Sequence, residues 1–452
     1  MTKKFLIIGG SDAGISAALR ARELDSNIGI DMLLTDKYPN FSICGLPFYL
    51  SGEVSNWHNL AHRKKSDIEA KDINVLTEHM AEKIDPKAKS VQAVNQTSNA
   101  NITLKYDKLL IGTGAKSKQP PIKGLDYPGV FFLRWMTDSF AIKNYLEKEQ
   151  PGSITIIGAG YIGLEMTEAM RKLGLTVNLV EYFPSILNTL DYQLSKIIRS
   201  ELEDNDVNIY TGTEVTQIKG RDKKLIVHGR DNFAVESDMV LVATGSAPNT
   251  TLAKETGIST GIHDAIQVNR KMETNLPDIY AAGDCTETYH NLLKEYRYVP
   301  LGTTAHKQGR IAGENVVGGN CKYAGSLATQ SVKIFDLVAA RTGLKNDEAR
   351  EEGFEPITTD LDTWDHKVYY PEAQKMHIRI SGDRQTQRLL GAQIVGAYGT
   401  EVSKRLDILA TAIHNEMMID DLNELDLSYT PPLSSPWDPV QMAAQKWMLE
   451  YK

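Results

Sequence analysis

One cysteine lies in a stretch whose residue types favour sulfur chemistry: Cys44, within residues 41–48 (FSICGLPF). Gly45 and Pro47 predict that a helix starts directly after the cysteine. A thiol at a helix N-terminus is held as the thiolate by exposed backbone amides and the helix dipole, and the thiolate is the reactive form. We therefore expect Cys44 to have a depressed pKa and to be redox-active.

A glycine-rich turn precedes this cysteine. It follows an apolar run at residues 5–8, which is typical of a buried parallel strand, and a helix is expected to continue from it through Leu24. The next predicted strand, residues 30–35, ends at an acid that lies 22 positions beyond the last glycine, a spacing that lets a carboxylate reach a ribose hydroxyl. Serine stands where such turns have their second glycine. The candidate cofactor residues here are Gly9, Gly10, Ser11, Ala13, Gly14, Asp36 and Lys37.

A second and more complete glycine-rich turn follows the predicted strand at residues 154–157. It reads G-x-G-x-x-G, leads into a helix through Leu173, and is followed by a strand at 176–180 that ends in Glu181. Such glycines allow a tight turn, a close approach of backbone to pyrophosphate, and helix-on-strand packing. An acid at Glu181 can bond the 2′-hydroxyl of ribose and repels a 2′-phosphate, which favours NADH over NADPH. The candidate residues are Gly158, Gly160, Tyr161, Ile162, Gly163 and Glu181.

The chain that carries these motifs has 452 residues, which is long enough for about three domains. A hydrophobic content of 41% and a charged content of 24% are those of a globular protein. The formal net charge of −8 argues against nucleic acid or an anionic membrane as a partner. Three widely spaced cysteines favour neither a disulfide framework nor a metal site, and the N-terminal residues read as neither a signal peptide nor a spanning helix. We expect a cytoplasmic protein.

Further strand-and-turn patterns extend both nucleotide-binding halves. Strands expected at residues 106–111 and 239–242 each lead into a Thr-Gly turn, and residues 278–284 predict a strand that ends in an acid, followed by a helix at 306–317. Beyond residue 325 the nucleotide-binding signals stop. The remaining patterns there, two antiparallel strands and an amphipathic helix, predict a third domain of the α+β class.

With these pieces in place, the chain resembles the two-dinucleotide-binding flavoprotein disulfide reductases over nearly its full length. The resemblance rests on both glycine-rich turns, both Thr-Gly turns and residues 280–284 (YAAGD). It implies an α/β fold with two Rossmann-like domains and a C-terminal α+β dimerisation domain. The implied divisions are an FAD-binding domain in two parts (1–119 and 247–324), an NAD(P)H-binding domain (120–246) and a dimerisation domain (325–452). It also implies that Asp284 holds the ribityl chain of FAD and that Tyr161 covers the flavin until NADH displaces it, with further cofactor contacts from Ser42, Thr113, Gly114, Gly245 and Ala305.

The branch of the family is indicated by the single cysteine. Relatives such as glutathione reductase carry C-x-x-x-x-C, whereas here the position five beyond Cys44 is Tyr49. The chain is therefore similar to the coenzyme A-disulfide reductases, persulfide reductases and NADH oxidases. Its C-terminal tyrosine motifs resemble those that reach the cysteine of the partner subunit, which implies a homodimer with shared active sites. We expect Tyr429 and Tyr369 to act there, and Tyr369 rather than Tyr370 because adjacent strand residues face opposite ways.

The resemblance implies an FAD-dependent NAD(P)H oxidoreductase that reduces a disulfide or persulfide, coenzyme A disulfide first, through Cys44. Arg22, Ser42 and Lys71 match positions that bind coenzyme A in the disulfide reductases. Alternatives are an NADH oxidase that uses O2 through a Cys44 sulfenic acid, a metalloid-thiolate reductase, and an NADH-responsive redox sensor. Peroxidase chemistry is not expected, because Ser11 and Asp12 stand where peroxidases have a histidine. The remaining cysteines and His306 are expected to be structural.

Overall fold

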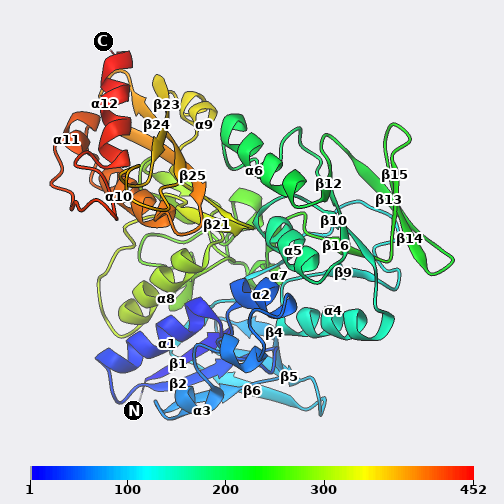
Figure 1. The fold of residues 1–452 in the computed structure, drawn as a ribbon. Coiled ribbons are helices and arrows are strands. Elements are labelled where there is room, and N and C mark those ends of the chain that lie inside the picture. Colours follow the sequence, from blue (N-terminus) through cyan, green and yellow to red (C-terminus); the bar gives the residue numbers. More distant parts are fainter. Residues whose placement is uncertain (1–2, 452) are drawn as a thin grey trace.

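The computed structural model describes residues 3–451 and is built around three five-stranded sheets, two parallel and one antiparallel, each with its own helices (Figure 1). The N-terminal sheet has the order β18-β7-β1-β2-β3, and all of its neighbouring strands are parallel. The edge strand β18 comes from much later in the sequence than the other four strands. The sheet is therefore built from two separated parts of the chain. The strands are β1 (Lys4–Ile8), β2 (Gly29–Leu33), β3 (Ile73–Leu76), β7 (Lys108–Ile111) and β18 (Ile279–Ala281).

Further helices and smaller sheets come from the same two parts of the chain as this N-terminal sheet. The helices are α1 (Asp12–Leu24), α2 (Leu46–Leu50), α3 (Lys65–Glu69), α7 (Thr251–Thr256) and α8 (Gly302–Val316), with 3-10 turns at Ile43–Gly45, Trp57–Leu60 and Ile262–Asp264. An antiparallel sheet comprises β4 (His79–Asp85), β5 (Ser90–Asn95) and β6 (Asn101–Lys105). Two short pairs are β8 (Ala115–Ser117) with β17 (Ser246–Pro248), and β19 (Thr288–His290) with β20 (Glu295–Arg297).

The middle of the chain repeats the parallel plan in a second sheet, of order β12-β11-β10-β16-β9. Its strands are β9 (Val130–Phe132), β10 (Ser153–Ile157), β11 (Thr176–Val180), β12 (Val207–Tyr210) and β16 (Met239–Val242). The helices are α4 (Met136–Glu149), α5 (Tyr161–Lys172) and α6 (Tyr192–Asp204). A three-stranded antiparallel sheet extends from it: β13 (Val215–Arg221), β14 (Lys224–Gly229) and β15 (Ala234–Ser237).

The C-terminal part is an antiparallel sheet of order β21-β22-β25-β24-β23. Its strands are β21 (Gln330–Ile334), β22 (Leu337–Gly343), β23 (Pro356–Trp364), β24 (Lys375–Asp383) and β25 (Leu389–Ala397). The helices are α9 (Asn346–Glu351), α10 (Val402–His414), α11 (Ile419–Asn423) and α12 (Pro439–Tyr451). The predicted α/β class with an α+β C-terminal domain is thus confirmed, whereas the exact domain boundaries remain predictions.

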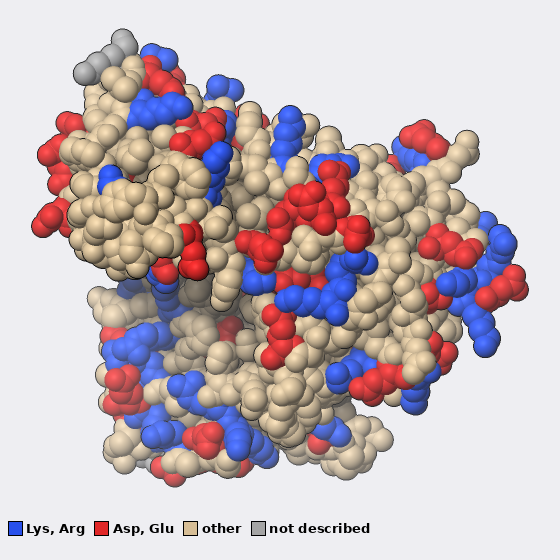
Figure 2. Space-filling view, in the orientation of Figure 1, with Lys and Arg blue, Asp and Glu red and all other residues tan. Residues whose placement is uncertain are grey.

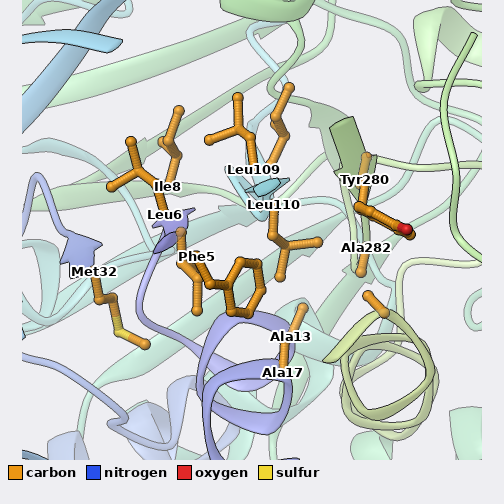
Figure 3. Packing of buried hydrophobic residues seen from close by; sticks show 14 of the residues in the cluster. Phe5, Leu6, Ile8, Ala13, Ala17, Met32, Leu109, Leu110, Tyr280 and Ala282 are labelled. Atoms are coloured by element: carbon orange, nitrogen blue, oxygen red, sulfur yellow. The ribbon is translucent and has the colours of Figure 1, made fainter. Parts of the chain in front are cut away.

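Small residues let α1 and α8 pack closely under the N-terminal sheet. Figure 3 shows Ala13 and Ala17 of α1 facing the sheet beside Phe5. A Cβ on Gly309 would lie 2.2 Å from the backbone oxygen of Ala13, and one on Gly313 would lie 2.3 Å from that of Ala17. The two helices therefore pack backbone to backbone, and this fixes the first turns of α1 relative to the middle of α8.

This packing predicts that Gly313→Ala destabilises the protein. The added methyl group collides with backbone rather than with a flexible side chain, so the helices must separate. We expect the free energy of unfolding to fall by about 2 kcal/mol, measured by urea unfolding. Gly152→Ala, at a glycine where the nearest atom to an added Cβ would lie 3.7 Å away, controls for the loss of a glycine as such. An unchanged unfolding midpoint for Gly313→Ala contradicts the close contact.

Candidate active site

A single large cavity of about 1980 Å³ joins the carboxyl ends of both parallel sheets. Pockets for one small ligand usually measure about 300–1,000 Å³, so this volume suits two dinucleotides. Most of the predicted cofactor residues line it: Gly9, Gly10, Ser11, Ala13, Asp36, Lys37, Thr113, Gly114, Gly158, Gly160, Tyr161, Ile162, Glu181, Gly245, Asp284 and Ala305. Gly14, Gly163 and Ser42 do not line it.

The first glycine turn is shaped by backbone contacts that exclude side chains. Gly9 has φ of +112°, and a Cβ on it would lie 2.0 Å from the oxygen of Gly112. A Cβ on Gly14 would lie 1.9 Å from the oxygen of Gly9. Gly14 therefore lies behind the turn and lets α1 approach β1, while Gly9, Gly10 and Ser11 face the cavity.

The second turn has the same construction. Gly158 has φ of +107°, and a Cβ on Gly163 would lie 1.9 Å from the oxygen of Gly158. Around Gly160, by contrast, no atom lies within 4 Å of the position a Cβ would take, so the turn leaves open space at the N-terminus of α5. Backbone amides and the helix dipole make such a space suitable for a pyrophosphate.

Glu181 closes this second turn from the end of β11. Its carboxylate accepts backbone N–H bonds from Ala159 at 2.6 Å and from Phe183 at 2.9 Å. The acid therefore holds the glycine turn as well as facing the cavity, a structural role that the spacing argument did not predict. The exposed rings of Tyr182 and Phe183 line the cavity beside it.

Asp284 lies at the cavity end of β18 and pairs with a residue that the sequence motifs did not identify, Arg134. Arg134 Nη2 donates to Asp284 Oδ2 at 2.7 Å, while its Nε is buried and has no partner within residues 3–451. A buried donor without a partner is costly, so this guanidinium is suited to a polar ligand in the cavity. Together with the two glycine turns, this arrangement fits FAD and a nicotinamide dinucleotide. Nothing in the sequence near Arg134 marked it, because its partner is 150 positions away.

Cys44 lies in the cavity wall within a 3-10 turn, Ile43–Gly45, and the following helix α2 has only five residues. The predicted depression of its pKa is wrong. Protein packed around the sulfur raises the pKa of Cys44, and the carboxylates of Glu165 and Asp12 raise it further, while Arg134 acts in the opposite direction. The thiol is nevertheless accessible from the cavity. The local sequence pattern gave the wrong direction for the pKa shift for two reasons: helix α2 is too short to supply a strong dipole, and the charged residues that act on Cys44 are distant in the sequence.

Glu165 is a second cavity residue that the sequence motifs did not mark. It lies on α5, four positions after Tyr161, so both side chains project from one face of the helix. Burial, and then the nearby Glu168, raise the pKa of Glu165 to about 7. The sequence signal that could have identified Glu165 is its i, i+4 spacing from Tyr161.

The C-terminal tyrosines do not line this cavity. Tyr369 and Tyr370 lie in a turn between β23 and β24, so the argument from alternating strand residues was wrong. Tyr369 is 74% exposed, and its hydroxyl lies beside Tyr429; partial burial and this neighbour raise the pKa of Tyr429. Tyr370 instead packs its ring against His366, at 5.8 Å between centroids. The paired Tyr369 and Tyr429 are thus on the surface of the chain.

The expected substrate residues lie outside the cavity, and Arg22 is already engaged. Its guanidinium donates to the backbone oxygens of Lys71, Ser26 and Asp72 at 3.1, 2.5 and 2.8 Å, which ties α1 to the loop before β3. The structure therefore does not support Arg22 as a free anion-binding group. Ser42 lies directly before the 3-10 turn of Cys44, and its N–H donates to Leu60.

A second hollow, a groove of about 510 Å³ between α1 and α8, is lined by several Lys and Arg side chains, of which Arg20 and Arg310 pair with Glu23. Figure 2 shows Lys and Arg gathered on the N-terminal lobe below a hollow that separates it from the C-terminal lobe. The groove is connected to the cavity by His306, which contacts Asp12 at 3.3 Å and Ser16 at 2.9 Å. His306 thus lines the groove and contacts α1, in addition to lying near the start of α8. We call this hollow the basic groove; its lining residues are Ile15, Ser16, Leu19, Arg20, Glu23, Arg63, His306, Lys307 and Arg310.

Two nucleotide-binding turns and an accessible thiol in one cavity define the class of the protein, a two-dinucleotide flavoprotein oxidoreductase. The family described as pyridine nucleotide-disulphide oxidoreductase matches residues 3–309, and the dimerisation domain of that family matches residues 329–439. The chain belongs to this family, which confirms the resemblance. It is therefore an FAD-dependent oxidoreductase that uses NAD(P)H, and the second match indicates a homodimer.

The names of proteins similar to this chain point to different electron acceptors. An NADH oxidase of Methanocaldococcus jannaschii is 31% identical over 97% of both chains. A coenzyme A disulfide reductase of Staphylococcus haemolyticus is 30% identical over 98% of this chain and 99% of its own. Among solved structures, an NAD-dependent persulfide reductase from A. fulgidus superposes with a TM-score of 0.95 at 35% identity, over 99% of this chain and 83% of the other. Within residues 3–451, no helix is both long and apolar enough to cross a membrane.

Proposed function

We propose that the protein is an NADH-dependent reductase of a disulfide or persulfide, with coenzyme A disulfide as the favoured acceptor. The observation that carries this proposal is the accessible Cys44 in the same cavity as both nucleotide turns. Cys285 is fully buried, and Cys321 lies outside the cavity with its sulfur bonded to Glu314, so neither is placed as a redox partner of Cys44. A single thiol forms a mixed disulfide with its substrate rather than an internal disulfide.

The chain holds two cofactors and one nucleophile in this mechanism. When bound, FAD accepts a hydride from NADH and passes the two electrons to sulfur. The glycine turns would hold the two pyrophosphates, and Asp284 and Arg134 would lie against FAD. Cys44 attacks the acceptor disulfide and releases the first thiol. Overall, one disulfide, one NADH and one proton give two thiols and NAD⁺.

The basic groove supports a phosphate-bearing acceptor. Arg63, Lys307 and Arg310 are exposed there, and the groove meets the cavity at His306 and Asp12. A coenzyme A chain carries several phosphate charges at one end and sulfur at the other. We therefore assign the phosphate end to the basic groove in place of Arg22 and Lys71.

The tyrosine pair supports active sites shared across a homodimer. Tyr369 and Tyr429 lie on the surface of the family's dimerisation domain, outside the cavity of their own chain. In a two-fold dimer these hydroxyls serve the cysteine of the partner subunit, where they protonate the leaving thiolate. A cytoplasmic location accompanies this proposal, because the reaction consumes NADH.

The reaction is tested by anaerobic assay of the purified holoenzyme. With coenzyme A disulfide present and oxygen excluded, we expect NADH to be consumed with two thiols formed per NADH. Consumption of NADH without thiol formation rules out disulfide reduction by this enzyme.

An NADH oxidase is the second candidate, because the oxidase from M. jannaschii matches this chain as fully as the disulfide reductase does. An accessible thiol such as Cys44 can cycle through sulfenic acid when oxygen is the acceptor. Turnover that begins only when air is admitted, and that needs no disulfide, assigns this function instead.

Nucleotide preference gives a prediction at Glu181. Its charge disfavours a 2′-phosphate, so kcat/KM is expected to be higher for NADH than for NADPH. Glu181→Gln keeps a hydrogen-bond acceptor for Ala159 but removes the charge. We expect the ratio of kcat/KM for NADH over NADPH to fall about tenfold, which corresponds to 1.4 kcal/mol. A ratio equal to that of the wild type shows that Glu181 does not select the nucleotide.

A further inference from the structure

The turn that carries Tyr369 encloses a buried histidine. This turn comprises residues 365–374, between β23 and β24, and we call it the tyrosine turn. His366 is only 8% exposed, whereas Tyr369 of the same turn is 74% exposed. Nδ1 of His366 lies 2.9 Å from Oδ2 of Asp365, and its Nε2 lies 3.1 Å from the backbone oxygen of Pro371. Both ring nitrogens therefore face oxygen acceptors, one before and one after the tyrosine in the sequence.

The imidazole of His366 can bond both acceptors only when each of its nitrogens carries a proton. A neutral imidazole has one N–H donor and one lone pair, whereas the imidazolium has two donors. In the neutral ring, one lone pair faces either the carboxylate of Asp365 or the carbonyl of Pro371. The bond to the charged carboxylate is the stronger of the two, so deprotonation removes the bond to Pro371.

The base of the tyrosine turn is fixed by other bonds, which do not depend on the histidine. Asp365 and Gln374 close the base, because each accepts a hydrogen bond from the backbone N–H of the other, at 2.9 and 3.0 Å. The buried guanidinium of Arg405 on α10 donates to the backbone oxygen of Asp365 at 2.8 Å. The N–H of Lys367 donates at 3.3 Å to the oxygen of Pro431, in the segment that carries the second tyrosine of the pair. The exposed tip of the turn, by contrast, is connected to this base through the imidazole.

We propose that His366 is a positioning residue for Tyr369: its protonated ring holds the tip of the tyrosine turn in place, and the neutral ring releases it. The inference rests on the proposed function for what Tyr369 does at the cysteine of the partner subunit, but not for the pH-dependent bond within the turn. The hydrogen bond to Asp365 raises the pKa of His366, and the carbonyl of Pro371 acts in the same direction, against the effect of burial. The tip is therefore held below this raised pKa and is released as the pH rises through it.

The charged groups around His366 leave this histidine as the titrating member of the network. Those that act most strongly on it are Asp365, which favours the proton, and Arg405 of α10, which opposes it. Arg405 is paired at 3.2 Å with Asp438, which lies just before α12, so its charge is offset. The ring of Tyr370 packs edge-on against the imidazole, at 5.8 Å between centroids. Histidine is the side chain whose ordinary pKa, about 6.5, lies nearest to neutral pH.

The bond within the turn is tested by hydrogen exchange of the tyrosine turn in the holoenzyme, without acceptor, from about pH 6 to about pH 9. After correction for intrinsic exchange rates, we expect the protection of these amides in the wild type to fall by about 2–10-fold as the pH rises, the effect of one hydrogen bond. His366→Asn should show the low protection at every pH, because a shorter side chain cannot reach both acceptors. Asp365→Asn keeps an oxygen acceptor but removes the charge, so it should move the transition to lower pH.

A second histidine–aspartate pair of the same sheet supplies the matched control. His377 of β24 pairs with Asp362 of β23, but this pair is largely exposed and lies outside the tyrosine turn. His377→Asn should reproduce the wild-type exchange profile. A wild-type turn that is equally protected at both ends of the pH range overturns the proposal. So does a His366→Asn profile that superimposes on that of the wild type, or a transition that disappears in His377→Asn.

A second measurement decides whether this bond serves catalysis. Misplacement of a reacting group by about 1 Å can cost about 10²-fold in rate. With coenzyme A disulfide, we expect kcat of the wild type to exceed that of His366→Asn by about 10-fold or more below the exchange transition, and to approach it above the transition. In a Tyr369→Phe background, His366→Asn should no longer change kcat, although the exchange transition should remain.

Equal values of kcat for wild type and His366→Asn below the transition overturn the positioning role. An effect of His366→Asn that is undiminished in the Tyr369→Phe background overturns it as well, because the histidine would then act through another group. If the wild type does not reduce coenzyme A disulfide at all, the proposed function has failed. The exchange profiles still decide whether His366 holds the turn.

Discussion

Cys44→Ser is expected to abolish reduction of coenzyme A disulfide, with turnover lowered by roughly 10³-fold or more. A serine hydroxyl cannot form the mixed disulfide through which the electrons must pass. The variant should still bind FAD, because the glycine turns and Asp284 are unchanged. NADH should therefore still bleach the flavin absorbance at close to the wild-type rate. The measurements are anaerobic NADH consumption with the acceptor and stopped-flow absorbance without it.

The controls for this variant separate chemistry from folding. Cys321→Ser changes a thiol outside the cavity and should leave both measurements unchanged. A Cys44→Ser enzyme that keeps its full rate of thiol formation would show that the electrons reach the acceptor without this cysteine. Loss of FAD from Cys44→Ser would place the residue among those that hold the cofactor.

Charge reversal in the basic groove is expected to raise KM for coenzyme A disulfide by roughly 10–100-fold. In the double variant Lys307→Glu and Arg310→Glu, two attractive contacts with phosphate become repulsive. Both side chains are exposed on α8, and the one ion pair that is lost, between Arg310 and Glu23 at 3.6 Å, is exposed as well, so the fold should tolerate the change. The value of kcat should change little, because Cys44 and the cofactor turns are not altered. The effect should weaken as salt is added, since exposed charges are screened.

A matched control carries the same change in net charge on a different surface. Lys219→Glu with Lys223→Glu lies on the β13–β14 hairpin, far from the groove in sequence and exposed to solvent. Its KM should equal that of the wild type. If the groove variant retains the wild-type KM for coenzyme A disulfide, the phosphate end of the acceptor binds elsewhere. An equal rise in KM in the hairpin variant would indicate a general effect of net charge.

The fold was predictable because its signals are local and periodic. The apolar runs at residues 5–8 and 154–157 became β1 and β10, within one residue at their first positions, and both glycine turns follow them as expected. Gly9 and Gly158 have left-handed φ angles that glycine adopts without strain, which is why these turns can be identified from sequence. The two antiparallel strands expected beyond residue 325 are β24 and β25, whereas β23 of the same sheet was not expected.

The candidate site was predictable only where a residue belongs to a local motif. Arg134 was missed because its partner, Asp284, lies 150 positions away. Glu165 was missed because its only signal is the i, i+4 spacing from Tyr161. The predicted sign of the Cys44 pKa shift was wrong because burial, and then the carboxylates of Glu165 and Asp12, raise that pKa, and because the helix after Cys44 has only five residues to supply a dipole. Sequence alone also does not show that the Arg22 guanidinium donates to three backbone carbonyl oxygens.

The central claim, that the acceptor becomes covalently attached to Cys44, is tested most directly by mass spectrometry of the oxidised holoenzyme mixed with coenzyme A disulfide. We predict one coenzyme A per subunit, located on the peptide that contains Cys44, and its release as free thiol when NADH is added anaerobically. An enzyme that turns over coenzyme A disulfide without ever carrying an adduct on Cys44, or whose adduct survives NADH, would contradict it.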